Sequence, residues 1–302
     1  MTTDNPDGKP SERATPPRRR ARYSGTHPKR FEQRYKELDP AAYPEVQDHV
    51  RAQGRTPAGT HVPVLVEEVL GALRPQPGDI VADCTIGYGG HALEFIQRIG
   101  PTGRLIGLDV DAAQIERTTA RLSALADGQA SVSLHRSHFA GLGKVLAREG
   151  LDGFDVVLAD LGVSSMQMDD PTRGFSYKYD GLSRRDWRDR PADQRTQLHP
   201  AARTFQALRI LVNDEKAALA QFLRIAPHCL RPGGRIGVIS FHSGEDVLVE
   251  NAFRDGLQTG LYAAIIEQPT QPTAQEITAN PRGRSALFRW AIAPSPRGRG
   301  SG

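Results

Sequence analysis

The sequence predicts an α/β fold, with a mostly parallel, doubly wound sheet of the Rossmann-like type. Short apolar segments alternate with amphipathic helical segments between residues 61 and 293, and a glycine-rich turn follows the first apolar segment. Three of the apolar segments also end in aspartate. Repeated strand–helix alternation requires crossover connections, which produce a parallel sheet with helices on both faces.

The first half of this region predicts four strands separated by helices. An amphipathic helix at 61–73 precedes them. The expected elements then follow in the order strand 79–84, helix 92–99, strand 104–109, helix 112–126, strand 131–135, helix 141–149 and strand 155–160. The last segment is apolar between its two terminal acids, which is typical of a strand buried on both faces.

The second half predicts fewer and less regular elements. After a stretch rich in Arg and Asp, a long helical segment at 203–229 is expected to break near Pro227. A turn at 232–234 leads into strand 235–240 and helix 245–255. The last two strand candidates, 263–268 and 286–292, have no predicted helix between them, so an antiparallel pair is expected.

Composition restricts the class of protein. The 302 residues include only two cysteines, Cys84 and Cys229, which argues against a disulfide scaffold and fits a reducing cytoplasm. No apolar run approaches the roughly 18 residues of a membrane span, and the N-terminus has no apolar signal-peptide core. We therefore expect a cytoplasmic protein without a membrane partner.

The positive charge is concentrated at the N-terminus. Residues 1–36 hold ten basic and four acidic side chains, a net charge of +6 against +4 for the whole chain. Such a composition predicts disorder, and the arm either contacts nucleic-acid phosphates or keeps the protein in solution. The expected organisation is an N-terminal extension at 1–60, one domain at 61–293 and a basic tail at 294–302.

A glycine-rich turn follows the first strand and predicts a ligand site. Gly87, Gly89 and Gly90 allow the backbone to approach a ligand closely at the start of the next helix. Gly87, Gly89 and Ala92, with Asp109 some twenty residues on, also match a dinucleotide fingerprint, so an NAD-dependent dehydrogenase is one alternative. The glycine pattern alone does not separate these ligands.

Acidic strand ends favour a cationic ligand over a pyrophosphate. Asp83, Asp109 and Asp160 end the first, second and fourth strands, and Asp83 lies at the mouth of the glycine turn. A pyrophosphate would be repelled there, whereas S-adenosylmethionine carries a sulfonium and an ammonium group but no phosphate. The alternative is that one of these acids only caps a helix.

Several motifs together resemble one family, the RsmH (MraW) methyltransferases of bacterial small-subunit ribosomal RNA. The resemblance covers about residues 61–293 and rests on His-Val-Pro-Val-Leu at 61–65, Asp-Cys-Thr-Ile-Gly-Tyr-Gly-Gly-His at 83–91, Asp-Leu-Gly-Val-Ser-Ser-Met-Gln-Met-Asp-Asp at 160–170, Arg-Gly-Phe-Ser at 173–176, His-Pro-Ala-Ala-Arg-Thr-Phe-Gln-Ala-Leu-Arg at 199–209, Ile-Ser-Phe-His-Ser at 239–243 and Asn-Pro-Arg-Gly-Arg-Ser at 280–285. It implies a class I methyltransferase fold with S-adenosylmethionine as cofactor. The implied substrate is 16S rRNA in the small ribosomal subunit, methylated at N4 of a decoding-centre cytidine usually numbered 1402.

The resemblance also implies a set of cofactor-binding residues. These are Asp83, Gly87, Gly89, Gly90, His91, Asp109, Phe139, Asp160 and Gln167. Asp109 would bind the ribose and Phe139 would flank the adenine, although Phe139 fits ordinary core packing equally well. His91 would either contact the cofactor or make a hydrogen bond at the start of its helix.

The expected chemistry suggests which residues act on the base. The exocyclic amine of cytosine is a poor nucleophile, so catalysis means aligning it and accepting its N–H hydrogen bonds. Asp160 is the predicted acceptor, Ser164, Ser165 and Gln167 could hold the base edge, and His242 contacts the base or satisfies a buried hydrogen bond. The histidines lack paired spacing and the cysteines are isolated, so no metal site is predicted.

An arginine-rich stretch is the predicted RNA surface, because a stacked base must be extruded to reach such a pocket. Its candidates are Arg173, Arg184, Arg185 and Arg203, and the alternative is a solvated loop. The resemblance fails at 181–198, where the family carries a helical insertion and this sequence has only a short link. Two alternatives therefore remain: methylation of another substrate, or a non-catalytic RNA-binding or ribosome-assembly protein.

Overall fold

The computed structural model describes residues 63–123, 129–162 and 215–295. Within these ranges the strands form a seven-stranded sheet of order β3-β2-β1-β4-β5-β7-β6. Their bounds are β1 Ile80–Asp83, β2 Arg104–Asp109, β3 Ser131–Arg136, β4 Phe154–Asp160, β5 Leu230–Ser240, β6 Ala264–Ile265 and β7 Leu287–Ile292. The first five strands are parallel, and β7 pairs antiparallel with both β5 and β6. The predicted α/β fold with a mostly parallel sheet is confirmed.

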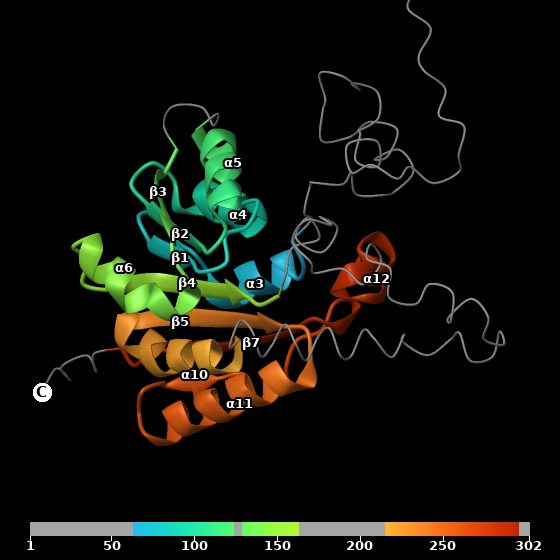
Figure 1. Ribbon diagram of the computed structural model, residues 1–302. Coiled ribbons are helices and arrows are strands. Elements are labelled where there is room, and N and C mark those ends of the chain that lie inside the picture. The colour runs from blue at the N-terminus through green and yellow to red at the C-terminus, as the bar shows by residue number, and fades with distance from the viewer. Residues whose placement is uncertain (1–62, 124–128, 163–214, 296–302) are drawn as a thin grey trace, which may run out of the picture.

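Helices cover both faces of this sheet (Figure 1). One layer contains α3 Val66–Leu73, α4 Gly90–Ile99 and α5 Ala112–Ser123, and the other contains α6 Leu142–Arg148, α10 Glu215–Ile225 and α11 Ser243–Gln258. Each layer buries its own apolar cluster against the sheet. Alternate side chains of β1 and β4 enter opposite clusters, as the two-residue period of a strand buried on both faces requires.

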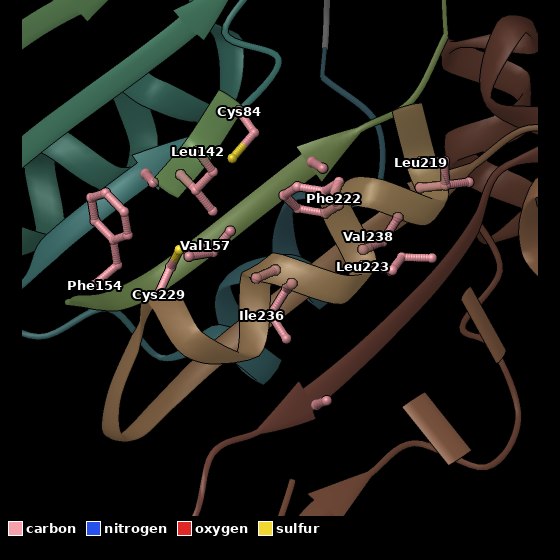
Figure 2. Packing of buried hydrophobic residues seen from close by; sticks show 14 of the residues in the cluster. Cys84, Leu142, Phe154, Val157, Leu219, Phe222, Leu223, Cys229, Ile236 and Val238 are labelled. Carbon is pink, nitrogen blue, oxygen red and sulfur yellow. The ribbon is translucent and has the colours of Figure 1, made fainter. Parts of the chain in front are cut away.

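The cluster beneath α6 and α10 shows how two distant parts of the chain close this core. Phe222 and Leu223 of α10 pack with Val157 of β4 and Ile236 of β5 (Figure 2). After Ile225 the chain continues in a 3₁₀ turn, Ala226–Cys229, with Pro227 in its first positions. The expected break near Pro227 is therefore confirmed, because proline cannot donate the hydrogen bond that would continue the helix.

Two predictions about the C-terminal half need correction. The expected turn at 232–234 lies inside β5, where the pairing with β4 jumps from Phe154↔Leu230 to Val156↔Arg235. The glycines thus form an irregularity in a longer strand instead of a turn before it.

The second correction concerns the region between the last two strands. They pair antiparallel as expected, but a helix, α12 Ala274–Ala279, and a 3₁₀ turn, Pro281–Ser285, lie between them. Thr273 caps α12 by accepting a hydrogen bond from the backbone N–H of Glu276. A Thr three residues before a Glu is a recognised helix-start signal, which the sequence analysis missed in so short a segment.

Candidate functional site

Three aspartates end neighbouring strands at one edge of the sheet. Asp83 ends β1, Asp109 ends β2 and Asp160 ends β4, and these strands run parallel, so all three lie at the carboxyl edge. The strand order reverses between β1 and β4, and ligands of doubly wound sheets bind at such a point. The structure therefore brings together the three carboxylates that the sequence placed at strand ends.

The glycine turn between β1 and α4 is held by the end of β2. Gly87 and Gly89 have φ angles of 48° and 79°, in the left-handed region that favours glycine. The N–H of Gly87 donates to Asp109 Oδ2 at 3.0 Å, while Asp109 Oδ1 accepts from the N–H of Asp111 at 2.8 Å. Each carboxylate oxygen keeps a second lone pair, so Asp109 can still accept hydroxyl donors from a ligand.

Helix α5 fixes the other side of the same turn, through residues that the sequence analysis missed. Thr118, which is fully buried, donates its hydroxyl hydrogen to the carbonyl of Gly87. Arg121 donates to the carbonyl of Tyr88 at 2.7 Å, and its guanidinium lies 4.5 Å from the centre of the Tyr88 ring. Thr118 and Arg121 are three residues apart and so lie on the same face of α5. This spacing is too common in sequences to predict that the face contacts the glycine turn.

Thr85 links the Asp83 carboxylate to the backbone of Asp160. Its N–H donates to Asp83 Oδ1 at 3.2 Å, and its hydroxyl accepts from the N–H of Asp160 at 2.6 Å. Asp83 is almost completely buried, and the Oδ1 atom of Asp160 is buried without a hydrogen-bond partner among the described residues. An acceptor in that position is suited to a cation or a hydrogen-bond donor supplied by a ligand.

Burial governs the electrostatics of this edge. The pKa of Asp83 is raised to about 7 and that of Asp160 to about 8, mainly by removal from water, and the charge of Asp83 contributes to the rise at Asp160. Burial also raises the pKa of Asp109, although its backbone hydrogen bonds oppose this effect. A cationic ligand would offset the unfavourable ionisation, whereas a pyrophosphate would add to it.

His91, in the first turn of α4, lies between the carboxylate edge and the segment before α3. Its Nε2 is 3.0 Å from the carbonyl oxygen of Val64, which can only accept, so this nitrogen carries a hydrogen. Its Nδ1 faces Asp160 Oδ2 at 3.9 Å. His91 thus joins the first turn of α4 to the segment before α3 and borders Asp160, and its contact with a cofactor stays a prediction.

Phe139 and His242 occupy positions that suit structural roles as well as the predicted ones. Phe139 is half-buried in a 3₁₀ turn, Phe139–Gly141, and its ring lies edge-on to Phe222 at 5.5 Å. His242 caps α11 by accepting the N–H of Glu245 at its Nδ1, and its Nε2 lies 2.9 Å from the Glu245 carboxylate. Contact with an adenine or with a base stays a prediction for both residues.

The remaining predicted site residues lie outside the described ranges. They are Ser164, Ser165 and Gln167 after β4, and the RNA-binding candidates Arg173, Arg184, Arg185 and Arg203. Among the residues that the structure does describe, no group of three or more His, Cys, Asp or Glu side chains could hold a metal ion. In the same ranges no helix is long and apolar enough to cross a membrane.

Comparison with known proteins identifies close relatives. A profile described as the MraW methylase family matches residues 58–185 and 187–293. The chain is 36% identical over 352 residues to "Ribosomal RNA small subunit methyltransferase H 1" of Lachnoclostridium phytofermentans, covering 94% of this chain and 96% of the relative. It is also 36% identical over 340 residues to "Ribosomal RNA small subunit methyltransferase H 2" of Alkaliphilus metalliredigens, covering 91% and 97%.

Solved structures give a more distant similarity. A crystal structure of an rRNA methylase from Streptococcus thermophilus aligns with 76% of this chain and 94% of its own, at 13% identity and a TM-score of 0.44. A similarity of this size supports no argument about activity.

Proposed function

Because the chain belongs to the MraW methylase family, we propose that it is an S-adenosylmethionine-dependent methyltransferase of small-subunit ribosomal RNA. The observation that carries this proposal is the acidic edge at the strand-order reversal, with a buried Asp160 oxygen that lacks a partner among the described residues. That edge suits a cationic nucleoside and disfavours NAD. The curated relatives with rRNA methyltransferase names supply the class of substrate.

The proposed cofactor-binding residues follow the geometry of the edge. Gly89, Gly90 and His91 present the glycine turn and the start of α4, and Asp109 has free lone pairs for the two ribose hydroxyls. Asp83 and Asp160 provide the negative potential that a sulfonium and an ammonium group require. Phe139 for the adenine and Gln167 after β4 complete the proposed set.

The finer proposal is methylation of the N4 amine of a decoding-centre cytidine. Bound S-adenosylmethionine supplies a methyl group on a positively charged sulfur, and as the new N–C bond forms the C–S electron pair stays on sulfur and N4 loses one proton. Asp160 is the proposed acceptor of that proton, because it ends β4 at the carboxyl edge and its Oδ1 atom has no hydrogen-bond partner among the described residues. Ser164 and His242 are proposed to hold or shape the base edge.

The RNA itself is proposed to bind through basic segments of the sequence. The basic extension at 1–60, the tail at 294–302 and the arginines in and around the short link at 181–198 carry the positive charge that phosphate contacts require. Each such contact contributes to a salt dependence of binding, so affinity for small-subunit particles should fall steeply between about 50 and 200 mM salt.

The experiment that tests this function is methyl transfer from labelled cofactor to small-subunit particles. Wild type, Asp160→Ala and the exposed-surface control Asp255→Asn are compared, and the methylated nucleoside is identified after digestion. We expect N4-methylcytidine with wild type and control and at least about a hundredfold slower transfer with Asp160→Ala. Equal rates for Asp160→Ala and wild type would show that Asp160 is not the proton acceptor. Binding of the cofactor without transfer to any RNA would instead favour a non-catalytic homologue.

A further inference from the structure

Asp83 and Asp160 point to the same face of the sheet, on the two strands that flank the strand-order reversal. In the β1–β4 register Asp83 pairs with Leu158, and Asp160 follows Leu158 by two residues. Side chains two residues apart on a strand share a face, so both carboxyls lie on the side that α3 and α4 cover. Thr85 donates its N–H to the Asp83 carboxylate and accepts the backbone N–H of Asp160 at its hydroxyl, so it hydrogen-bonds to both residues.

The described surroundings of this pair contain no fixed positive charge. From α4, His91 presents Nδ1 to Asp160 at 3.9 Å, and from β2 the Asp109 carboxylate adds further negative potential. The Cys84 thiol lies in the apolar cluster on the opposite face. Among the described groups that face the pair, His91 is therefore the one that can carry a positive charge.

Two carboxyls on one face of neighbouring strands, both largely removed from water, cannot both ionise easily, because each charge is poorly solvated and repels the other. Consistent with this, burial raises the pKa of both groups, and the charge of Asp83 raises the pKa of Asp160. Such a pair takes up and releases protons as one unit and not as two independent acids.

We propose that Asp83 and Asp160 share one proton when no cation is bound, exchange it for the positive charge of the incoming cofactor, and take one back from the substrate amine. This inference rests on the proposed function and assigns Asp83 a role in it. Asp160 contacts the reacting groups, whereas Asp83 is a positioning residue that sets the proton affinity of Asp160.

The proposed proton exchange keeps the net charge of the site constant during the reaction. Before transfer the site holds one sulfonium charge and an ionised pair. During transfer the N–C bond forms, the C–S electron pair returns to sulfur, and a neutral thioether replaces the sulfonium. The proton that leaves N4 protonates the pair at the moment when the compensating positive charge disappears. The net charge of the site is therefore the same before and after the methyl group moves.

The test is a count of protons exchanged on ligand binding, measured by calorimetry on the full chain. S-adenosylmethionine and S-adenosylhomocysteine are titrated separately near pH 7.5 in phosphate and in Tris, whose ionisation enthalpies differ. The dependence of the heat on the buffer gives the number of protons released. The two ligands differ chiefly in the sulfonium methyl group and its charge, so we expect the methylated ligand to release up to one proton more.

Variants identify the residues responsible. Asp160→Asn should abolish the difference between the two ligands while S-adenosylhomocysteine still binds, which shows that the variant is folded. Asp83→Asn should move the pH at which the difference is greatest to lower values, because Asp160 then ionises without a charged neighbour. The exposed control Asp255→Asn should behave as wild type.

The possible failures are distinguishable. Equal proton counts for the two ligands in wild type, or an unchanged difference in Asp160→Asn, would overturn the shared proton and leave the methyltransferase function intact. An unchanged pH dependence in Asp83→Asn would overturn the positioning role of Asp83. Absence of binding by both ligands would overturn the proposed function and this inference with it.

Discussion

Glu276 accepts a hydrogen bond from the backbone N–H of Leu65 at 2.6 Å, although the two residues are 211 positions apart. Leu65 is fully buried, and its φ of 56° is unusual for a residue other than glycine. It precedes α3, and the preceding carbonyl, that of Val64, holds His91 beside the carboxylate edge. Glu276 thus connects α12 to the start of α4 through one strained peptide.

Replacement of Glu276 should test this connection. Glu276→Ala leaves the N–H of Leu65 without an acceptor among the described residues, which should destabilise the fold by about 1–3 kcal/mol. Glu276→Gln keeps an acceptor oxygen and should retain most of the stability. Urea unfolding measures both, with the exposed neighbour Gln275→Ala as control. Equal stability of Glu276→Ala and wild type would show that water replaces the carboxylate.

Asp160→Asn should change how stability depends on pH. The pKa of Asp160 is raised from 3.8 to about 8, so between these values the folded state retains a proton that the unfolded chain loses. Raising the pH through this window therefore destabilises the folded protein, by up to about 1.4 kcal/mol per pH unit. Asparagine imitates the protonated acid and removes this effect.

The expected result is a variant that is more stable than wild type at pH 8.5 and similar to it at pH 4. Without ligand, we expect a gain of about 2 kcal/mol or more at pH 8.5, or roughly 4–8 °C in Tm. Thermal unfolding across the pH range measures it, with Asp255→Asn as control. Parallel curves for wild type and Asp160→Asn would contradict the raised pKa.

Gly89→Ala should weaken cofactor binding more than overall stability. Gly89 has a φ of 79°, which side chains rarely allow. A Cβ atom at this position would also lie 3.2 Å from Thr118 Cγ2. The left-handed conformation alone costs about 1–2 kcal/mol with a side chain, and any relaxation shifts the turn. We expect at least about a tenfold loss of S-adenosylmethionine affinity by calorimetry.

Gly71→Ala is the matched control for that substitution. It lies within α3, where a Cβ would meet open space, and alanine should stabilise the helix by roughly 0.5–1 kcal/mol. If Gly89→Ala and Gly71→Ala bind the cofactor equally well, the geometry of the turn does not control binding.

Arg289→Met should destabilise the protein strongly. Arg289 of β7 is buried and binds Asp246 through two nitrogens, at 2.7 and 3.0 Å, and Glu250 at 2.8 Å. Its loss leaves these acids without this partner, which should cost about 3–5 kcal/mol.

Arg254→Met removes a more exposed partner of the same Glu250 and should cost at most about 1 kcal/mol. Chemical denaturation compares the two variants. A similar, small loss in both would mean that the buried pair contributes little to the free energy of unfolding.

Much of the architecture was predictable because it depends on local patterns. β2 and β4 are short apolar runs that each end in an aspartate. A run of this kind predicts a strand buried on both faces without any knowledge of the neighbouring strands. Asp83, Asp109 and Asp160 could be placed at one edge because parallel strands end together.

Short, irregular elements were less predictable. The helix α12 has six residues, too few for a periodic apolar pattern, so only the Thr273–Glu276 cap marks it. The irregularity within β5 looked like a turn because Pro232 and two glycines normally end a strand. In β5 the pairing with β4, and not local preference, determined the conformation.

By itself, the sequence determined the fold class, the family motifs and the positions of the acids at strand ends, since each depends on residue type and spacing within one segment. Tertiary structure decided that β1 and β4 are neighbours, and therefore that Asp83 and Asp160 are joined through Thr85. It also decided that Thr118 and Arg121 hold the glycine turn. The physical reason is that strand order follows from how the crossover helices pack on each face, and the burial that raises the pKa of both acids arises only when those faces close.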